Sequence, residues 1–190
     1  MFKKILVSLF AFSFGSVLTI NAADDPSRFR IYYPASTSAT IENCATCTVT
    51  AEGYSLHYVF GFGLGIGMSS SKAKVSGDTS SSSDYSYDAD SMIDLSYTFG
   101  SDFTFTLGYG AGQGKISGHS ALTTSSGSSS NSLIGLGYNF GGIEVLVGMR
   151  SVSTTVQGSY KVNILGTLVD VPLEVNSSWN TTDIGIGFTF

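Results

Sequence analysis

The sequence has few charged residues: only 12% are Asp, Glu, Lys or Arg, about half the share found in ordinary soluble domains. It has no basic run, and its net charge is -5, which excludes a surface that neutralises nucleic-acid phosphates. It holds just 3 Pro and 2 Cys, whereas Gly is abundant at 23 residues and aromatics make up 13%. Low charge together with many Gly and aromatic residues favours a protein whose outer surface faces lipid.

Long apolar runs are also scarce, and the one that is present stands at the start. Lys3 and Lys4 precede an apolar stretch over 5–20, which ends in the small residues of 21–23. This pattern predicts a cleaved signal peptide over residues 1–23. An uncleaved membrane helix is the alternative, disfavoured by the short run and the small-residue site. No later stretch of the sequence reaches the ~18 apolar residues of a helical span, so one domain is expected over 24–190.

A short pattern returns along that domain: an aromatic residue, any residue, Phe, and then a Gly turn. It occurs at 58–61, 97–100 and 138–141, and again without the glycine at 188–190. Each copy ends a run with a period of two, which is the signal of a β-strand, and short Gly-containing links join such runs into hairpins. Eight strands are expected, over residues 28–34, 51–60, 62–72, 85–99, 103–115, 131–140, 143–158 and 177–190.

Between the tight hairpins lie longer polar connections, expected near 35–50, 73–84, 116–130 and 159–176. Short turns at one end, long loops at the other and alternating strands of about ten residues are typical of outer-membrane barrels. Closure follows because an open sheet edge in lipid would leave amides and carbonyls without partners. The predicted fold class is therefore all-β, an eight-stranded antiparallel up-and-down transmembrane β-barrel.

The alternation also predicts which side chains face lipid. In 103–110 the aromatic and Leu side chains face outward and Thr or Gly faces the lumen, and in 143–150 Ile, Val and Met face outward. A soluble barrel of the lipocalin kind is the alternative, but it would crowd the aromatics into a narrow lumen and leave glycine on the surface. Eleven aromatics at the short-turn ends predict one interfacial girdle, and the opposite girdle is expected from Tyr33, Tyr85, Tyr87 and Trp179.

The sequence resembles the small OmpA- and OmpX-like outer-membrane barrels of Gram-negative bacteria over the whole domain. The resemblance is most specific at the last strand, where Asp183, Gly185, Phe188 and Phe190 match the family's barrel-assembly signal. It implies an outer-membrane location with both termini in the periplasm. It also implies contact with outer-membrane lipid and lipopolysaccharide, and with the barrel-assembly machinery during insertion.

Charged side chains of inward parity are the main candidate site. Buried charges must be paired, and acids and bases are both present, so a lumen network that fills the barrel is the first hypothesis. The alternative is a narrow gated pore for ions or small solutes, whereas a wide channel needs about 16 strands. The expected network consists of Arg28, Arg30, Asp90, Asp94, Glu144, Arg150 and Asp183, with His57 also facing inward.

Cys44 and Cys47 form a CxxC in the first long connection. A redox site or half of a zinc site would need further elements that the sequence does not offer, so a small loop disulfide is expected outside the cytosol. No cofactor or metal is expected. An enzyme that modifies lipid is disfavoured, because it needs a positioned nucleophile or acid–base set at the rim.

The fourth connection is apolar and alternating, and it is expected to form a hairpin beyond the membrane. Its edges can pair with another chain, or it can pack on the loop that contains Cys44. Its candidate partner residues are Val162, Ile164, Leu168 and Val171. The sequence thus predicts a non-enzymatic outer-membrane protein with a role in surface interaction or envelope integrity.

Deleting Phe190 is expected to reduce assembly into the outer membrane, because the terminal aromatic completes the assembly signal implied by the resemblance. The measurement is the heat-modifiable barrel band on gels of outer-membrane fractions. A normal amount of that band would contradict the prediction.

Overall fold

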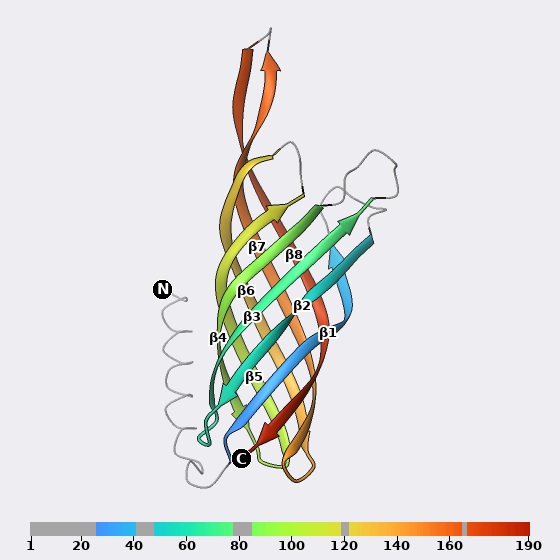
Figure 1. Ribbon diagram of the computed structural model, residues 1–190, viewed down its shortest axis with the longest axis vertical. Helices are drawn as coiled ribbons and strands as arrows, with labels where there is room; N and C mark the ends of the chain where they lie inside the picture. Colours follow the sequence, from blue (N-terminus) through green and yellow to red (C-terminus); the bar gives the residue numbers. More distant parts are fainter. Residues whose placement is uncertain (1–25, 41–47, 78–84, 119–121, 165–166) are drawn as a thin grey trace, which may run out of the picture.

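The computed structural model describes residues 26–40, 48–77, 85–118, 122–164 and 167–190. Its eight strands are antiparallel, each pairs with the next along the chain, and the last pairs with the first to close a barrel (Figure 1). The predicted fold class is confirmed. The strands are β1 (Arg28–Thr40), β2 (Thr48–Val59), β3 (Leu64–Ser76), β4 (Tyr85–Phe99), β5 (Phe103–Ser117), β6 (Leu122–Asn139), β7 (Ile143–Ile164) and β8 (Thr167–Thr189).

Three tight turns join β2 to β3, β4 to β5 and β6 to β7 at the same end of the barrel (Figure 1). The predicted break between the strands expected over 51–60 and 62–72 is confirmed, since Gly63 donates its N–H to the carbonyl of Phe60 at 2.8 Å in the turn between β2 and β3. The start of β1 and the end of β8 meet at this end, where the Phe190 N–H bonds the Ser27 carbonyl at 3.0 Å. In the parts of the chain that the structure describes, no helix is long and apolar enough to cross a membrane.

Seven of the eight strands are longer than the sequence predicts, whereas β4 has the predicted bounds, and this corrects the expected loop boundaries. Residues 35–40, 48–50, 73–76, 116–117 and 122–130 belong to strands rather than to the loops near 35–50, 73–84 and 116–130. Over 159–176, β7 and β8 form the hairpin that the sequence predicts for the fourth connection. The error has a physical cause. Serine-rich composition indicates loops in general, but here Ser and Thr occupy the solvent face of strands whose backbone groups are satisfied in the ladder.

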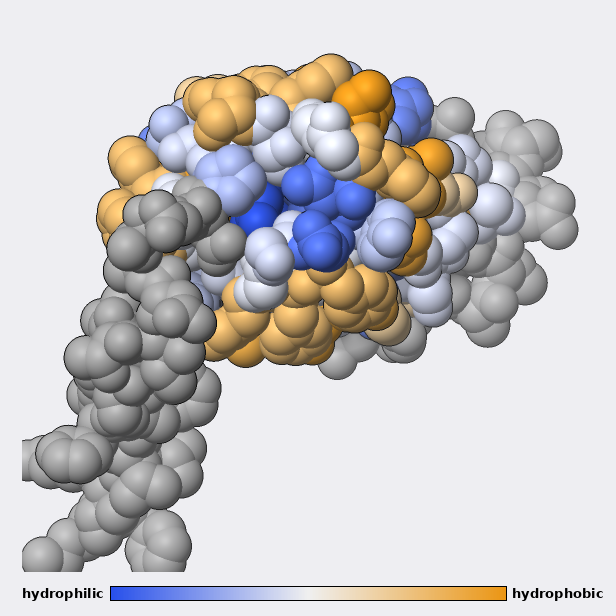
Figure 2. All heavy atoms as spheres, turned by 90° about the horizontal axis from the view of Figure 1, so that it is seen from below, coloured by the Kyte–Doolittle hydropathy of each residue, from blue (hydrophilic) through white to orange (hydrophobic). Residues whose placement is uncertain are grey.

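The half of the barrel nearest the tight turns is apolar outside and polar inside. Viewed from that end, hydrophilic residues occupy the centre and hydrophobic residues surround them (Figure 2). On β7, Val147 is 50% exposed while its neighbours Leu146 and Gly148 face inward and are buried. The outward belt comprises Phe29, Ile31 and Tyr33 on β1, Leu56 and Tyr58 on β2, Leu64, Ile66 and Met68 on β3, Ile93, Leu95 and Tyr97 on β4, Phe103, Phe105, Leu107 and Tyr109 on β5, Ile134, Leu136 and Tyr138 on β6, Ile143, Val145, Val147 and Met149 on β7, and Ile184, Ile186 and Phe188 on β8.

In the other half the distribution is reversed, with an apolar interior and a polar outer face. We call this interior the apolar cap. Tyr85, Tyr87 and Trp179 pack in or against it, so the prediction that they form a second outer girdle is wrong, and only Tyr33 of that set faces outward. Burial raises the pKa of the Tyr87 hydroxyl to about 12. The apolar cap consists of Ala51, Ala73, Val75, Tyr87, Ala89, Met92, Val152 and Trp179.

Aromatic rings contact one another at the tight-turn end, as the first girdle predicts. Tyr97 and Phe99 lie edge to face with ring centroids 4.7 Å apart, and Tyr138 and Phe140 do the same at 4.6 Å. Phe190, the last residue, lies 6.3 Å from the ring of Tyr58 on β2. Such rings favour a membrane–water interface, where an apolar body and a polar tip are both accommodated.

Replacing Val147 by Arg is expected to lower the free energy of unfolding in lipid vesicles by about 2–4 kcal/mol, because the side chain sits mid-belt on the lipid face. Ser153→Arg is the matched control, since this residue is on the same strand and the same face but beyond the belt. Urea unfolding followed by tryptophan fluorescence measures both. Equal losses for the two variants would place the lipid boundary elsewhere.

Candidate functional site

The centre of the lumen holds a buried ion pair between Arg30 on β1 and Glu144 on β7. The Arg30 Nε and Nη2 atoms donate to the two carboxylate oxygens of Glu144 at 2.8 and 2.7 Å, so the pair is bidentate. The remaining guanidinium hydrogens reach the hydroxyls of Thr98, Thr104 and Thr106 at 2.7–3.2 Å. The Arg30 side chain therefore crosses from β1 to β4, β5 and β7 and fills this level of the lumen.

A second charged layer lies above the first and centres on Arg150 of β7. Its Nε donates to Asp183 at 2.9 Å and its Nη2 donates to the Ser55 hydroxyl at 2.7 Å. Asp94 of β4 completes the layer, with its Oδ2 atom 3.3 Å from His57 Nε2 and 3.7 Å from Arg150 Nη1. The four charged and imidazole side chains come from β2, β4, β7 and β8, so they too link opposite walls.

Asn131 joins this layer to the apolar cap. Its amide nitrogen donates to Asp94 at 2.9 Å and to the Ser69 hydroxyl at 3.0 Å, and it lies 3.3 Å from the sulfur of Met92. Directly above, the Trp179 indole N–H donates to Ser71 at 2.9 Å. Polar side chains thus pass without a break into the apolar cap along the barrel axis.

Inward glycines make the room that this network occupies. A Cβ atom on Gly110 would lie 1.9 Å from the Asp94 carboxylate, and one on Gly187 would lie 2.8 Å from Glu144. A Cβ on Gly67 would meet the ring of His57 at 2.9 Å. The glycine face of the strands is therefore the space that admits the long charged side chains.

Six of the seven predicted lumen charges lie inside the barrel. Arg28 is nearest the tight turns, where it donates to the carbonyls of Gly100 and Ser101 at 3.1 and 3.2 Å. Three arginines face three carboxylates, so the formal charge inside is balanced, as buried charge requires. The six are Arg28, Arg30, Asp94, Glu144, Arg150 and Asp183, each at most 5% exposed.

Asp90 is the exception, and its placement in the lumen was wrong. The β4–β5 register shifts between Asp90 and Ile93, and Ser91 has a φ of 51°. This bulge adds a residue to one strand and so reverses the facing of everything beyond it. Asp90 pairs in register with the exposed Gln113 and forms an ion pair with Lys115 on the outer face.

Ser55, His57 and Asp94 share the residue types of a hydrolase triad but not its geometry. In a triad the imidazole uses one nitrogen for the nucleophile and the other for the acid. Here the same Nε2 atom faces both the Ser55 hydroxyl, at 3.1 Å, and Asp94, at 3.3 Å. Arg150 also donates to Ser55, and all three side chains are buried. The arrangement neutralises buried charge and does not activate a nucleophile.

The partners of the network were not predictable from the charges alone. Thr98, Thr104 and Thr106 are ordinary inward strand residues, and only the three-dimensional position of Arg30 makes them its acceptors. The one indication in the sequence was that all three stand at alternating positions expected to face the lumen. Cys44 and Cys47 lie outside the described residues, as does the predicted signal peptide. Within the described ranges, no group of three or more His, Cys, Asp or Glu side chains is arranged to hold a metal ion.

The fourth connection is the outer part of β7 and β8, which we call the β7–β8 hairpin (residues 156–164 and 167–175). It rises beyond the rest of the barrel (Figure 1). Tyr160 pairs with Val171 and Val162 with Val169, so these four share one apolar face. Leu168 pairs with Asn163 on the opposite, polar face, which corrects its grouping with Val162 and Val171. The side chain of Ile164 lies outside the described part.

The free edge of the hairpin is on β8. β1 pairs with β8 only as far as Ser178, and no described residue pairs with that edge over 167–177. Tyr160 is 37% exposed, Val169 40% and Leu173 37% on the apolar face. The hairpin therefore presents both an apolar face and a strand edge.

The fold of this chain is similar to that of known outer-membrane proteins. No family model matches the chain, and no curated protein matches it. Among solved structures it is similar to the outer membrane protein AlkL in lipid bilayers, with 15% identity and a TM-score of 0.55 over 88% of this chain and 91% of that one. It is also similar to Neisserial surface protein A, with 14% identity and a TM-score of 0.51 over 86% and 96% of the two chains. The chain thus has the eight-stranded outer-membrane barrel fold.

Replacing Glu144 by Ala is expected to lower the free energy of unfolding by about 3–5 kcal/mol, because Arg30 is then buried without its counter-charge. The double variant Arg30→Met with Glu144→Leu is expected to recover most of this loss, since no unpaired charge remains. Urea unfolding in detergent micelles measures both.

The matched control is Glu52→Ala, which breaks the exposed Glu52–Lys74 pair on the outer face. It is expected to change the free energy of unfolding by less than about 1 kcal/mol. A Glu144→Ala variant no less stable than this control would contradict the proposed importance of the buried pair.

Proposed function

We propose that this protein is a non-enzymatic integral outer-membrane protein whose barrel is a filled support and whose activity lies in its outer segments. The role is surface interaction or envelope integrity, exerted through the β7–β8 hairpin. The barrel lies in the outer membrane of a Gram-negative bacterium, with the tight turns and both termini on the periplasmic side. The apolar belt and the fold that the chain shares with two outer-membrane barrels support this location.

The observation that carries the proposal is the filling of the lumen. Arg30 crosses it at one level, Arg150 at the next, and the apolar cap follows above. Each level uses side chains from opposite walls, so a solute has to break buried ion pairs to pass. That cost disfavours transport and leaves the outer segments as the parts free to act.

The hairpin is the outer segment best suited to recognition. Its polar face is internally satisfied, since the Gln157 amide donates to Glu174 at 2.9 Å and Lys161 stands opposite Asp170. Its apolar face, by contrast, is uncovered by the described residues around Tyr160 and Val169. Exposed apolar surface on an element that stands clear of the barrel supports a protein or surface partner.

The second candidate function is a narrow gated pore. Two observations favour it over an enzyme. The lumen is lined by charged groups, and the buried atoms Arg150 Nη1 and Asp94 Oδ2 have no hydrogen-bond partner among the described residues. A displaced network would expose them to water. An enzyme that modifies lipid has no comparable support, because the buried Ser55–His57–Asp94 group lacks the required geometry.

Purified protein in planar bilayers is expected to give no current steps above the protein-free background, because the network and the apolar cap block the axis. A sixteen-stranded porin in the same bilayers is the positive control. A steady current that changes in Glu144→Ala would contradict the filled barrel and establish the pore alternative.

Replacing Val162, Val169 and Val171 by Thr is expected to reduce cell–cell aggregation and surface adhesion of expressing cells to the vector level. Threonine keeps the β-branched shape, so the hairpin stays paired while its apolar face is lost. Entry of a large antibiotic through the envelope is measured alongside, to read the integrity role.

The matched control replaces Lys161 and Asp170 by Thr on the opposite face of the same hairpin, and it is expected to behave as wild type. Heat-modifiability of the barrel band checks folding of each variant. Unchanged adhesion and unchanged antibiotic entry in the apolar-face variant would contradict the proposed role of this hairpin.

A further inference from the structure

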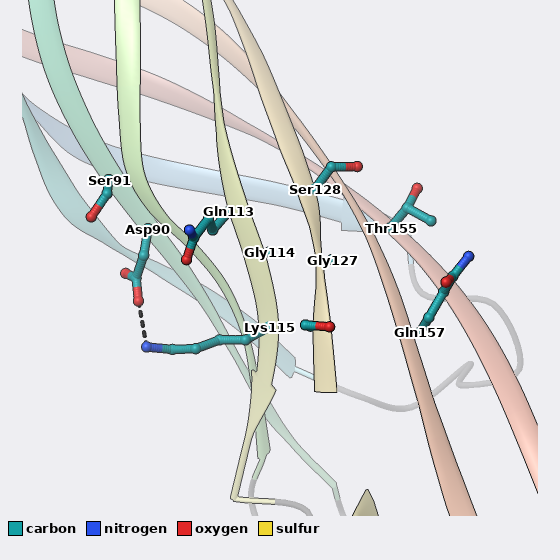
Figure 3. A pocket seen from close by; sticks show the side chains of 10 residues that line it. Asp90, Ser91, Gln113, Gly114, Lys115, Gly127, Ser128, Thr155 and Gln157 are labelled. Atoms are coloured by element: carbon teal, nitrogen blue, oxygen red, sulfur yellow. Dashed lines mark ion pairs between the residues drawn. The ribbon is translucent and has the colours of Figure 1, made fainter. Parts of the chain in front are cut away.

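The outer face of the barrel carries a groove of about 650 Å³ over β4, β5, β6 and β7 (Figure 3). On its β4–β5 side stand Asp90 and Lys115, and on its β7 side stands Gln157. Its middle is formed by Gln113 and Ser128 with the short side chains around them. Long side chains at two sides and small ones between give the sheet a hollow of the size that binds small molecules.

The hollow is built into the backbone. Gly114 of β5 and Gly127 of β6 are paired in register. A Cβ on Gly114 would lie 2.6 Å from the Thr154 methyl group, and one on Gly127 would lie 1.9 Å from the Thr155 carbonyl. A Cβ atom at either position would have to displace these atoms, so glycine permits the close packing beneath the groove. The bulge at Ser91 turns Asp90 outward to complete the opposite side.

The chemistry of the groove is neutral and rich in hydrogen-bonding groups. Its one acid and one base neutralise each other, and the hydrogen bond between them lowers the pKa of Asp90 and raises that of Lys115. The other groups are two primary amides, four hydroxyls and glycine backbone, and the Gln157 amide also donates to Glu174 at 2.9 Å. Nothing in it matches an acyl chain, and its balanced charge gives no preference for phosphate.

The groove lies beyond the apolar belt, on the part of the barrel outside the lipid. Gln113 follows the belt residue Tyr109 by four positions on β5, which is about 10 Å along the barrel axis for a tilted strand. Between belt and groove, β6 and β7 present only serine outward. These serines are Ser130, Ser132, Ser151 and Ser153. The surface that leads up from the lipid to the groove is therefore uncharged and hydroxylated.

We propose that this groove is a saccharide-binding site, which takes the sugar part of an outer-leaflet glycolipid or a free oligosaccharide. Amides and hydroxyls spaced along four strands match the many donors and acceptors of a neutral sugar ring, and the balanced Asp90–Lys115 pair offers one of each kind. The inference rests on the proposed function only for the outward orientation of this end of the barrel.

The test measures binding of a free core oligosaccharide, prepared by deacylating a rough-type lipopolysaccharide, to full-length protein in detergent micelles. Saturation-transfer NMR and calorimetry are expected to show saturable binding to wild type. Ser128→Trp, which fills the groove, is expected to abolish it. Replacing Gln113 and Gln157 together by Ala is expected to weaken it about five- to tenfold through the lost hydrogen bonds.

The matched control is Ser178→Trp, an exposed outward serine on β8 that does not line the groove, and it is expected to bind as wild type. A second arm compares unfolding temperatures in nanodiscs that contain lipopolysaccharide with or without its core sugars. A stabilisation by the core sugars that Ser128→Trp removes assigns the ligand to the glycolipid. Binding of the free sugar without that stabilisation assigns it to a soluble saccharide.

No saturable binding in either arm would overturn the inference, and so would equal binding by wild type and Ser128→Trp. The proposed function fails differently, by fractionation of the protein outside the outer membrane. In that case the free-oligosaccharide arm still decides whether the groove binds sugar.

Discussion

The fold depends on one constraint, that a strand surrounded by lipid must find every backbone partner inside the protein. Closure of β8 on β1 meets it throughout the apolar belt, where each described strand is paired on both sides. The pairing of β1 with β2 ends at Tyr32 and Ser55, although both strands continue. That seam opens beside the outward tyrosines Tyr33 and Tyr54, at the edge of the belt. Beyond this level water can satisfy the freed amides, and the Thr37 hydroxyl accepts one of them, from Ala51, at 2.9 Å.

The same boundary explains why the barrel has two opposite interiors. Within the belt the apolar side chains face the lipid, so the side chains that face the lumen are polar. The ion pairs of Arg30 and Arg150 connect opposite walls of the barrel. Beyond the belt, the polar side chains face water, and the interior is a small apolar core around Trp179. The strands keep their alternation across this change, and only the chemistry of the two faces is exchanged. A single chain thus joins a membrane barrel to a short soluble one.

Alternation alone was enough to predict the architecture and most of the lumen. A period of two, counted from the tight-turn end of the barrel, placed Arg30, Glu144 and Arg150 correctly, because β1 and β7 contain no irregularity between that end and these residues. The alternation failed at Asp90, because a β-bulge that the sequence pattern does not indicate reverses which side chains of β4 face the lumen. Trp179 was misplaced for another reason. Its parity with Asp183 pointed inward, but the expectation that aromatics form two girdles overrode it. Loop boundaries failed because serine-rich strands beyond the belt have the composition of loops.

The filled lumen bears on where the proposed recognition would take place. Long charged side chains, and the glycines that make room for them, occupy the interior and stabilise it, which supports a binding surface on the outside. The two proposed surfaces are both local departures from a regular sheet. The β7–β8 hairpin extends beyond its neighbours, and the described residues leave Tyr160 and Val169 exposed, whereas the groove lies where Gly114 of β5 pairs with Gly127 of β6. One surface is apolar beside a strand edge that no described residue pairs with, and the other is neutral and hydrogen-bonding. Their chemistries differ, and no side chain that lines the groove belongs to the apolar face of the hairpin, so the two proposed sites would take different partners without competing for the same side chains.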